Sequence, residues 1–320
     1  MARRIVVTRR IPEPALHLLR EAGDVWLSPN DRPLTVPELH EAAAGADAIL
    51  TMLHDRVDAA YLDAAGPGLR VVANVAVGYD NVDVPACTER GVRFTNTPGV
   101  LTDATADIAF SLILMATRRL GEGERTIRAR EPWSFSMFFH LGTSIQGKTL
   151  GIVGLGQIGT ATARRARAFG MEVVYSGRRA ADPALERELG AHRVELDELL
   201  ASSDVVSLHC PLTPETRHLI NGPRLRQMKP SAYLVNTTRG PVVDEAALAA
   251  ALREGVIAGA GLDVFEREPE VHADLLELEN VVLLPHLGSA TVETRTAMAV
   301  LAARNAIAVL DGAAPPTPVN

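Results

Sequence analysis

A glycine-rich segment at residues 154–159 constrains the fold of this 320-residue chain more than any other feature. It reads Gly-Leu-Gly-Gln-Ile-Gly, follows an apolar run at residues 150–153 and opens a helical pattern that extends to about Phe169. Between a strand and a helix, the first glycine permits a tight turn, the second lets the backbone approach a pyrophosphate, and the third allows close helix–strand packing. The helix N-terminus adds N–H donors for the anion. The segment predicts a dinucleotide site lined by Gly154, Gly156, Gln157, Ile158 and Gly159.

Short β-branched, apolar runs alternate with helical patterns on both sides of this segment. In the first hundred residues, strands are predicted at 5–7, 24–27, 48–50, 71–73 and 92–94. A second series is predicted at 150–153, 172–175, 205–208, 232–235, 259–262 and 281–284. Because strands that alternate with helices form parallel sheets, we predict an α/β fold. It has two Rossmann-like or flavodoxin-like parallel-sheet domains separated by a cleft.

A long apolar helix is predicted between the two series, from about Leu101 to a stop at Gly121, followed by a second helical stretch to about Arg130. Residues 131–140 are then dense in aromatic side chains, although only 4% of the chain is aromatic. A segment this apolar is usually covered, either by its own domain or by a partner subunit. A last helix is predicted from about Thr291 to Leu310.

The composition of the chain indicates its cellular compartment and excludes some classes of partner. Its 39 acidic and 32 basic residues give a net charge of −7, which repels a phosphate backbone and argues against nucleic-acid binding. Two cysteines, Cys87 and Cys210, are too few for a disulfide framework, and neither has the neighbours of a zinc site. The longest apolar stretch is about half of what spans a bilayer. We therefore predict a cytoplasmic protein without a metal site and without a membrane segment.

The end of the second strand of the dinucleotide unit predicts which cofactor is used. A carboxylate about 20 residues after the fingerprint normally binds the ribose 2′-hydroxyl of NAD. Here the corresponding residues are Ser176, Arg178 and Arg179. A hydroxyl and two guanidinium groups bind a 2′-phosphate in charge-assisted fashion. We predict NADP(H) in preference to NAD(H); the alternative is that the arginines only solvate a surface turn.

Three polar segments follow strands of the second series. They are Asn-Thr-Thr-Arg-Gly at 236–240, Gly-Leu-Asp-Val-Phe-Glu-Arg-Glu-Pro at 261–269 and Pro-His-Leu-Gly-Ser-Ala at 285–290. The carboxyl ends of parallel strands converge on one crevice, so Arg239, Glu268 and His286 are expected to meet there. With the fingerprint upstream, these segments resemble the D-isomer-specific 2-hydroxyacid dehydrogenases, and the resemblance runs from about Asp47 to the C-terminus.

The resemblance implies a catalytic role for each of these three residues. Reduction of a 2-oxo acid needs hydride at the carbonyl carbon and a proton for the oxygen. His286 matches the acid/base of the family, Glu268 the carboxylate that orients the imidazole and favours its protonated form, and Arg239 the group that holds the substrate carboxylate and polarises the ketone. The resemblance also implies that substrate is bound by Leu53, Val77, Gly78, Arg239 and His286.

Further cofactor contacts and the domain boundaries follow from the same resemblance. Cofactor contacts are implied for Thr105, Pro211, Thr216, Thr238, Asp263 and Gly288, of which Asp263 would receive the nicotinamide carboxamide. Each of these residues could equally serve packing or capping. A formate/glycerate dehydrogenase-like arrangement places residues 1–100 plus 290–320 in a substrate-binding domain and 101–289 in the dinucleotide-binding domain. The family also implies a homodimer formed through the cofactor domain.

Within this family the chain resembles most the glyoxylate/hydroxypyruvate reductases. The similarity depends on Ser-Gly-Arg-Arg at 176–179, Val-Gly-Tyr-Asp-Asn-Val-Asp at 77–83 and Thr-Asp-Ala-Thr-Ala-Asp at 102–107. It implies NADPH-dependent reduction of glyoxylate to glycolate and of hydroxypyruvate to D-glycerate. His54 and the segment 137–140 depart from the pattern, which leaves phenylpyruvate, D-lactate or phosphoglycerate chemistry open. A corepressor-like module that senses nicotinamide also remains an alternative, since such modules keep the same three residues.

Overall fold

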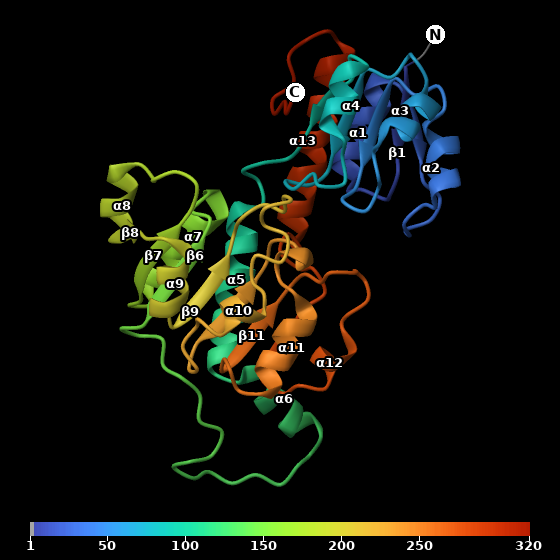
Figure 1. Cartoon of the computed structure of the whole chain (residues 1–320). Helices are drawn as coiled ribbons and strands as arrows, with labels where there is room; N and C mark the ends of the chain where they lie inside the picture. Colours follow the sequence, from blue (N-terminus) through green and yellow to red (C-terminus); the bar gives the residue numbers. More distant parts are fainter. Residues whose placement is uncertain (1–2) are drawn as a thin grey trace. The chain divides into compact units, whose positions relative to one another are not determined.

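The computed structural model describes residues 3–320 and contains two compact units, each built on a parallel β-sheet (Figure 1). One unit comprises the chain up to Leu101 together with Ala290–Asn320, and the other comprises Thr102–Ser289. All strand pairs in both sheets are parallel. The predicted α/β class with two parallel-sheet domains is confirmed.

The sheet of the first unit has five strands in the order β2-β1-β3-β4-β5, which is the flavodoxin order. The strands are β1 (Arg4–Val7), β2 (Asp24–Leu27), β3 (Ala48–Thr51), β4 (Val71–Asn74) and β5 (Arg93–Thr95). The helices are α1 (Glu13–Ala22), α2 (Val36–Ala43), α3 (Ala59–Ala65), α4 (Val84–Glu89) and α13 (Val292–Leu310). Side chains of α1 and α13 pack on one face of the sheet, and those of α2, α3 and α4 on the other. The residues of α13 that face the sheet include several alanines, which let this helix lie close to the strands.

The sheet of the second unit has seven strands in the order β12-β11-β10-β9-β6-β7-β8. The strands are β6 (Thr149–Val153), β7 (Glu172–Ser176), β8 (Ala191–Arg193), β9 (Val205–Leu208), β10 (Tyr233–Asn236), β11 (Gly259–Leu262) and β12 (Val281–Leu283). The helices are α5 (Thr102–Thr117), α6 (Leu120–Arg128), α7 (Gln157–Ala168), α8 (Pro183–Leu189), α9 (Leu196–Ser202), α10 (Gly222–Leu225), α11 (Glu245–Arg253) and α12 (Ala273–Leu276). Residues of α5 and α7 pack on one face, and residues of α9 to α12 on the other. The strand order reverses between β6 and β9, where doubly wound sheets bind their ligands.

Two features of the second unit differ from the sequence prediction. The prediction that Gly121 stops the long helix is wrong: α5 ends at Thr117, and Gly121 lies inside α6. The break is made by Arg119, which has a left-handed φ of 52° and pairs with Glu122 through both carboxylate oxygens. Strand β8 was also not predicted, because it has only three residues and two of them are polar and exposed.

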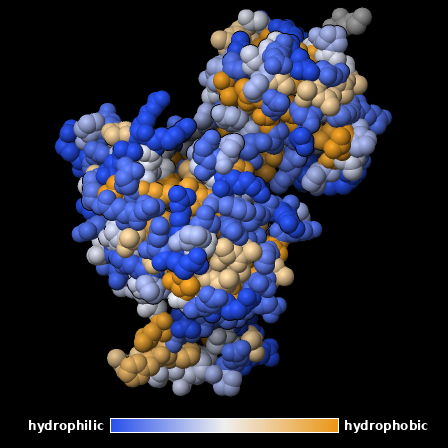
Figure 2. Space-filling view, in the orientation of Figure 1, coloured by the Kyte–Doolittle hydropathy of each residue, from blue (hydrophilic) through white to orange (hydrophobic). Residues whose placement is uncertain are grey.

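The aromatic segment that follows α6 is exposed. Phe135 and Phe138 are 85% and 86% accessible, and Trp133, Met137 and Leu141 are exposed as well. Figure 2 shows apolar side chains gathered on the segment that follows α6. The chain's own second unit therefore leaves these side chains uncovered. In the described part of the chain, no helix has the length and hydropathy needed to cross a membrane.

Candidate active site

The glycine loop between β6 and α7 has the geometry that a bound pyrophosphate requires. Gly154 has a φ of 99°, and a Cβ there would lie 2.9 Å from the backbone nitrogen of Cys210. A Cβ on Gly159 would lie 2.4 Å from the carbonyl oxygen of Gly154, so α7 packs directly against the loop. In contrast, a Cβ on Gly156 would meet no described atom within 4 Å. Space is left open where a ligand approaches the N-terminus of α7, so the loop is suited to hold the pyrophosphate of a dinucleotide.

The turn after β7 lies directly beside this loop. The Gly154 N–H donates to the carbonyl oxygen of Ser176 at 2.8 Å, which joins the two segments. Arg178 and Arg179 are exposed, and no acidic residue occurs in the turn 176–179. Tyr175 braces the chain that follows: its hydroxyl accepts from the N–H of Ala181 at 2.7 Å and donates to Glu186 at 2.6 Å. The turn therefore presents guanidinium groups where an NAD-binding protein has a carboxylate.

His286 and Glu268 are in contact, although 18 positions separate them. Nδ1 of His286 lies 2.8 Å from Oε2 of Glu268. The second carboxylate oxygen, Oε1, accepts the N–H of Phe265 at 3.1 Å. Because a carboxylate only accepts, Nδ1 carries the proton in this contact, which leaves Nε2 for exchange with a substrate. The arrangement is suited to a general acid/base with an orienting partner.

Asp263 fixes the loop that carries His286. Its two carboxylate oxygens accept the N–H groups of Leu287 at 2.6 Å and Gly288 at 2.8 Å, and its carbonyl oxygen accepts the N–H of His286 at 2.9 Å. Burial raises the pKa of Asp263. On the other side, the hydroxyl of Thr105 donates to the carbonyl oxygen of Gly288 at 3.1 Å. These contacts hold His286 at a φ of 54°, a left-handed conformation that a non-glycine residue keeps only where its surroundings enforce it.

The loop that carries Arg239 lies against the loop that carries Glu268. Asn236, the last residue of β10, donates to the carbonyl oxygen of Arg239 at 2.9 Å and accepts from the N–H of Thr238 at 3.0 Å. A Cβ on Gly240 would lie 1.8 Å from the carbonyl carbon of Phe265, so only glycine fits there. The structure thus brings together the three loops that carry Arg239, Glu268 and His286 at the carboxyl ends of β10, β11 and β12.

Pro211 and Thr216 belong to a turn at the carboxyl end of β9. The hydroxyl of Thr216 donates to the carbonyl oxygen of Pro211 at 2.7 Å and accepts the N–H of Thr213 at 2.7 Å. The adjacent residue Cys210 is the one that Gly154 approaches. Thr216 therefore has a structural use of its own, and the turn lies next to the glycine loop.

In the first unit, asparagine side chains hold the carbonyl groups of Val77 and Gly78 in the segment after β4. Asn96 donates to the carbonyl oxygen of Val77 at 2.8 Å, and Asn74 donates to that of Gly78 at 3.2 Å. Among residues 3–320, no acceptor is found for the N–H groups of Val77 and Gly78. Two backbone donors in a fixed loop form a suitable site for a carboxylate.

Leu53 lies in a turn held by a buried carboxylate that the sequence analysis missed. Oδ2 of Asp55 accepts the N–H of Met52 at 2.8 Å and the hydroxyl of Thr8 at 2.5 Å, and burial raises the pKa of Asp55. Asn81 donates to the carbonyl oxygen of Asp55 at 2.8 Å. His54 is exposed on this turn. The only sequence signal for this network is a set of polar residues just after apolar strands.

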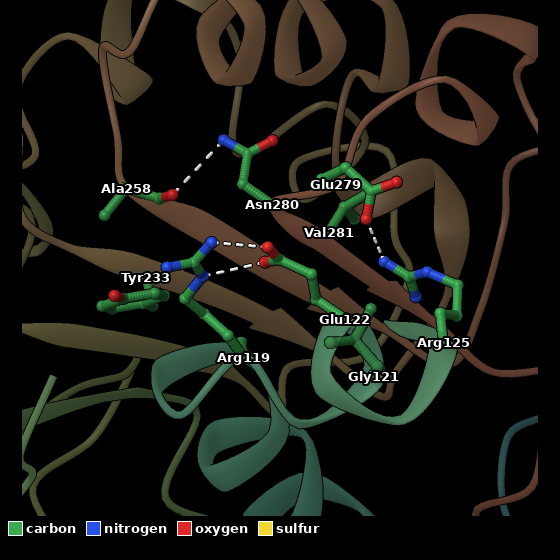
Figure 3. A pocket seen from close by; sticks show the side chains of 11 residues that line it. Arg119, Gly121, Glu122, Arg125, Tyr233, Ala258, Glu279, Asn280 and Val281 are labelled. Atoms are coloured by element: carbon green, nitrogen blue, oxygen red, sulfur yellow. Dashed lines mark hydrogen bonds and ion pairs between the residues drawn. The ribbon is translucent and has the colours of Figure 1, made fainter. Parts of the chain in front are cut away.

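A hollow of about 280 Å³ lies at the opposite end of the second sheet, next to the start of β10 and β12 (Figure 3). Its charged side chains are already paired, Arg119 with Glu122 and Arg125 with Glu279. The glycine loop, the turn 176–179 after β7 (here called the selecting turn) and His286 all lie at the carboxyl ends of strands, so this hollow is separate from the candidate site. Among the described residues, no cluster of His, Cys, Asp or Glu is arranged to hold a metal ion.

A dinucleotide fold with a histidine–carboxylate pair at the same sheet edge as its glycine loop is typical of a nicotinamide-dependent oxidoreductase. Comparison with known proteins agrees: the profile described as "D-isomer specific 2-hydroxyacid dehydrogenase, NAD binding domain" matches residues 110–288. The chain belongs to the D-isomer specific 2-hydroxyacid dehydrogenase family.

Relatives along the full length are named as glyoxylate reductases. The glyoxylate reductase of Thermococcus onnurineus is 51% identical over 326 residues, which cover 100% of this chain and 96% of that protein. The crystal structure of a glyoxylate reductase from Paecilomyes thermophila has a TM-score of 0.90 at 36% identity and covers 99% and 98% of the two chains. An NADPH-dependent glyoxylate/hydroxypyruvate reductase from Sinorhizobium meliloti, solved with NADP and malonate, has a TM-score of 0.86 at 37% identity and covers 100% and 97%.

Proposed function

We propose that the protein is an NADPH-dependent reductase of small 2-oxo acids, which converts glyoxylate to glycolate and hydroxypyruvate to D-glycerate. The observation that carries the proposal is the 2.8 Å contact between His286 and Glu268, held by Asp263 at the sheet edge that carries the glycine loop. Residues 1–100 with 290–320 would bind the substrate, and residues 101–289 the dinucleotide. The glyoxylate reductases among the relatives support this choice of substrate.

In the proposed reaction, the bound cofactor supplies a hydride to the carbonyl carbon of the 2-oxo acid. The guanidinium of Arg239 and the N–H groups of Val77 and Gly78 hold the substrate carboxylate, and Leu53 contacts the substrate beside them. His286 donates a proton to the carbonyl oxygen as negative charge develops there, and Glu268 stabilises the imidazolium. In the reverse direction His286 accepts the proton from the hydroxyl group.

The cofactor is proposed to lie along the glycine loop with its 2′-phosphate at Ser176, Arg178 and Arg179. Thr105, Pro211, Thr216, Thr238, Asp263 and Gly288 complete the proposed cofactor contacts. Asp263 and Gly288 already form the brace of the His286 loop. Cofactor bound at these residues would therefore contact the same loop that positions the acid/base.

Initial rates with four acids and two cofactors test the function. We expect fast oxidation of NADPH with glyoxylate and hydroxypyruvate, slow oxidation with pyruvate and phenylpyruvate, and poor use of NADH, because the selecting turn carries guanidinium groups and no carboxylate. The measurement is the near-ultraviolet absorbance of the reduced nicotinamide. Preference for NADH would refute the cofactor proposal, preference for phenylpyruvate would move the function to aromatic 2-oxo acids, and no turnover with any acid would favour a nicotinamide-sensing module.

We also propose that the protein is a homodimer in which the exposed segment after α6 covers a second copy. Phe135 and Phe138 are more than four-fifths exposed, and α6 adds Leu120 and Ile127, so an apolar surface remains that a partner would bury. Both cysteines are free, which suits a reducing compartment such as the cytoplasm, where we place the enzyme.

Replacing Phe135 and Phe138 together by serine is expected to shift the protein from dimer to monomer, because it removes the most exposed apolar side chains of the segment. Light scattering after size-exclusion chromatography measures the change. V292S is the matched control, since Val292 is 80% exposed but lies on α13 of the other unit. A double variant that stays dimeric, or a wild-type protein that is monomeric at micromolar concentration, would contradict the proposal.

A further inference from the structure

Strand β8 brings an additional arginine to the turn that selects the cofactor. β8 lies beside β7 at the edge of the seven-stranded sheet (Figure 1). Arg193 of β8 is opposite Tyr175 of β7. Nε of Arg193 donates to the carbonyl oxygen of Gly177 at 3.0 Å. Gly177 stands between Ser176 and Arg178, so the guanidinium of Arg193 lies against the middle of the selecting turn.

Little acidic charge neutralises this guanidinium. Glu195 is its acidic partner, with Oε1 3.8 Å from Nη2, and the Glu195 side chain is 83% exposed. An ion pair this long and this exposed contributes little free energy. Glu186, also close to the turn, accepts from the hydroxyl of Tyr175.

Glu215 is an acidic group close enough to Arg178 to be influenced by its charge. A hydrogen bond from the side chain of Thr213, together with the charge of Arg178, holds the pKa of Glu215 below its ordinary value. The long, exposed pair with Glu195 does not draw the guanidinium of Arg193 away from the turn, because Nε stays bonded to the Gly177 carbonyl oxygen. Arg193 is thus fixed by a backbone contact and only weakly paired.

We propose that Arg193 is a third specificity-determining residue for NADPH, in addition to Arg178 and Arg179. It fixes the turn through the Gly177 carbonyl and adds positive charge beside the 2′-phosphate. The inference rests on the proposed NADPH preference of the enzyme. A 2′-phosphate carries negative charge and accepts charge-assisted hydrogen bonds, whereas the 2′-hydroxyl of NADH does not need a cation. The charge of Arg193 therefore stabilises bound NADPH selectively.

Three substitutions separate charge from bracing. R193K keeps the charge, R193Q keeps an N–H donor for Gly177 without the charge, and R193A removes both. We expect KM for NADPH to rise about tenfold in R193Q and R193A and less than about threefold in R193K. A charged side chain at position 193 attracts the 2′-phosphate more strongly than a neutral one. In R193Q and R193K, KM for NADH and kcat with either cofactor should stay at the wild-type value.

R164Q is the matched control, since Arg164 lies in the same unit, pairs with Glu188 and is 55% exposed. It removes one positive charge from the unit and should leave both KM values unchanged. If R193Q keeps the wild-type KM for NADPH, or if KM for NADH rises equally in R193Q, Arg193 only braces the turn and the inference is wrong. Preference of the wild-type enzyme for NADH is a different result, because it refutes the proposed cofactor before any variant is made.

Discussion

Replacement of His286 by alanine is expected to lower kcat/KM for 2-oxo acid reduction by about a thousandfold, because a positioned general acid contributes on this scale. In the structure, Nδ1 of His286 is engaged by Glu268 and the loop is fixed by Asp263, so Nε2 is the group that would donate the proton. The loss should appear mainly in kcat, since the proton is transferred in the chemical step.

Binding of NADPH to H286A is the accompanying measurement, made by titration of the cofactor fluorescence. We expect an affinity close to that of the wild-type enzyme, which shows that the variant folds and that the chemical step is lost. H17A serves as the control, because His17 lies on the exposed face of α1 with 72% of its side chain accessible. An H286A variant with wild-type turnover would remove His286 from the mechanism.

Replacement of Arg239 by methionine is expected to reduce kcat/KM by about a hundredfold or more, since the guanidinium would hold the substrate carboxylate and stabilise charge on the carbonyl oxygen. Arg239 is half-buried, and its backbone is fixed by Asn236 on one side and by the tight packing of Gly240 on the other. The planar guanidinium of Arg239 would thus be presented to the substrate in one orientation. R239K keeps the charge without the planar guanidinium, so its kcat/KM should lie between those of the wild-type enzyme and R239M.

Steady-state rates with glyoxylate over a wide concentration range measure this effect. We expect KM for glyoxylate to rise strongly in R239M while KM for NADPH stays the same. R253M is the control, because Arg253 is an exposed arginine of α11 that pairs with Asp274. An equal loss of kcat/KM in R239M and R253M, or an unchanged KM for glyoxylate in R239M, would refute the proposed role of Arg239.

The dinucleotide half of the site could be predicted from local sequence because its geometry is set by short-range spacing. Three glycines over six residues, between a strand and a helix, leave few other conformations, and the structure shows a positive φ in the turn at Gly154 and close packing at Gly159. The contact of Glu268 with His286 depends on two separate loops, so the spacing of residues alone could not predict it. It was inferred from the shared end of parallel strands and from the family resemblance.

Features that the sequence did not reveal depend on long-range burial. Asp55 is ordinary in its local context, and its role becomes visible only when Thr8, 47 positions earlier in the chain, is brought to its carboxylate. The end of α5 is similar, because Arg119 takes a left-handed conformation that its residue type does not favour and Gly121 continues as helix. Arg119 also donates to the carbonyl oxygen of Leu141 at 3.3 Å, so a contact with a distant segment accompanies a conformation that local propensity does not favour.

The position of Arg193 on β8 also has a consequence for solubility. β8 is the last strand on its side of the sheet, so its outer backbone groups are available for pairing with another chain. Natural proteins block such edges with short strands and charged side chains, and β8 has both in its three residues, Ala191–Arg193. If Arg193 were replaced by valine or isoleucine to favour NADH, the edge strand would lose its charged side chain. Edge-to-edge aggregation would then accompany the altered cofactor preference. A polar replacement such as glutamine keeps the edge protected while it removes the charge.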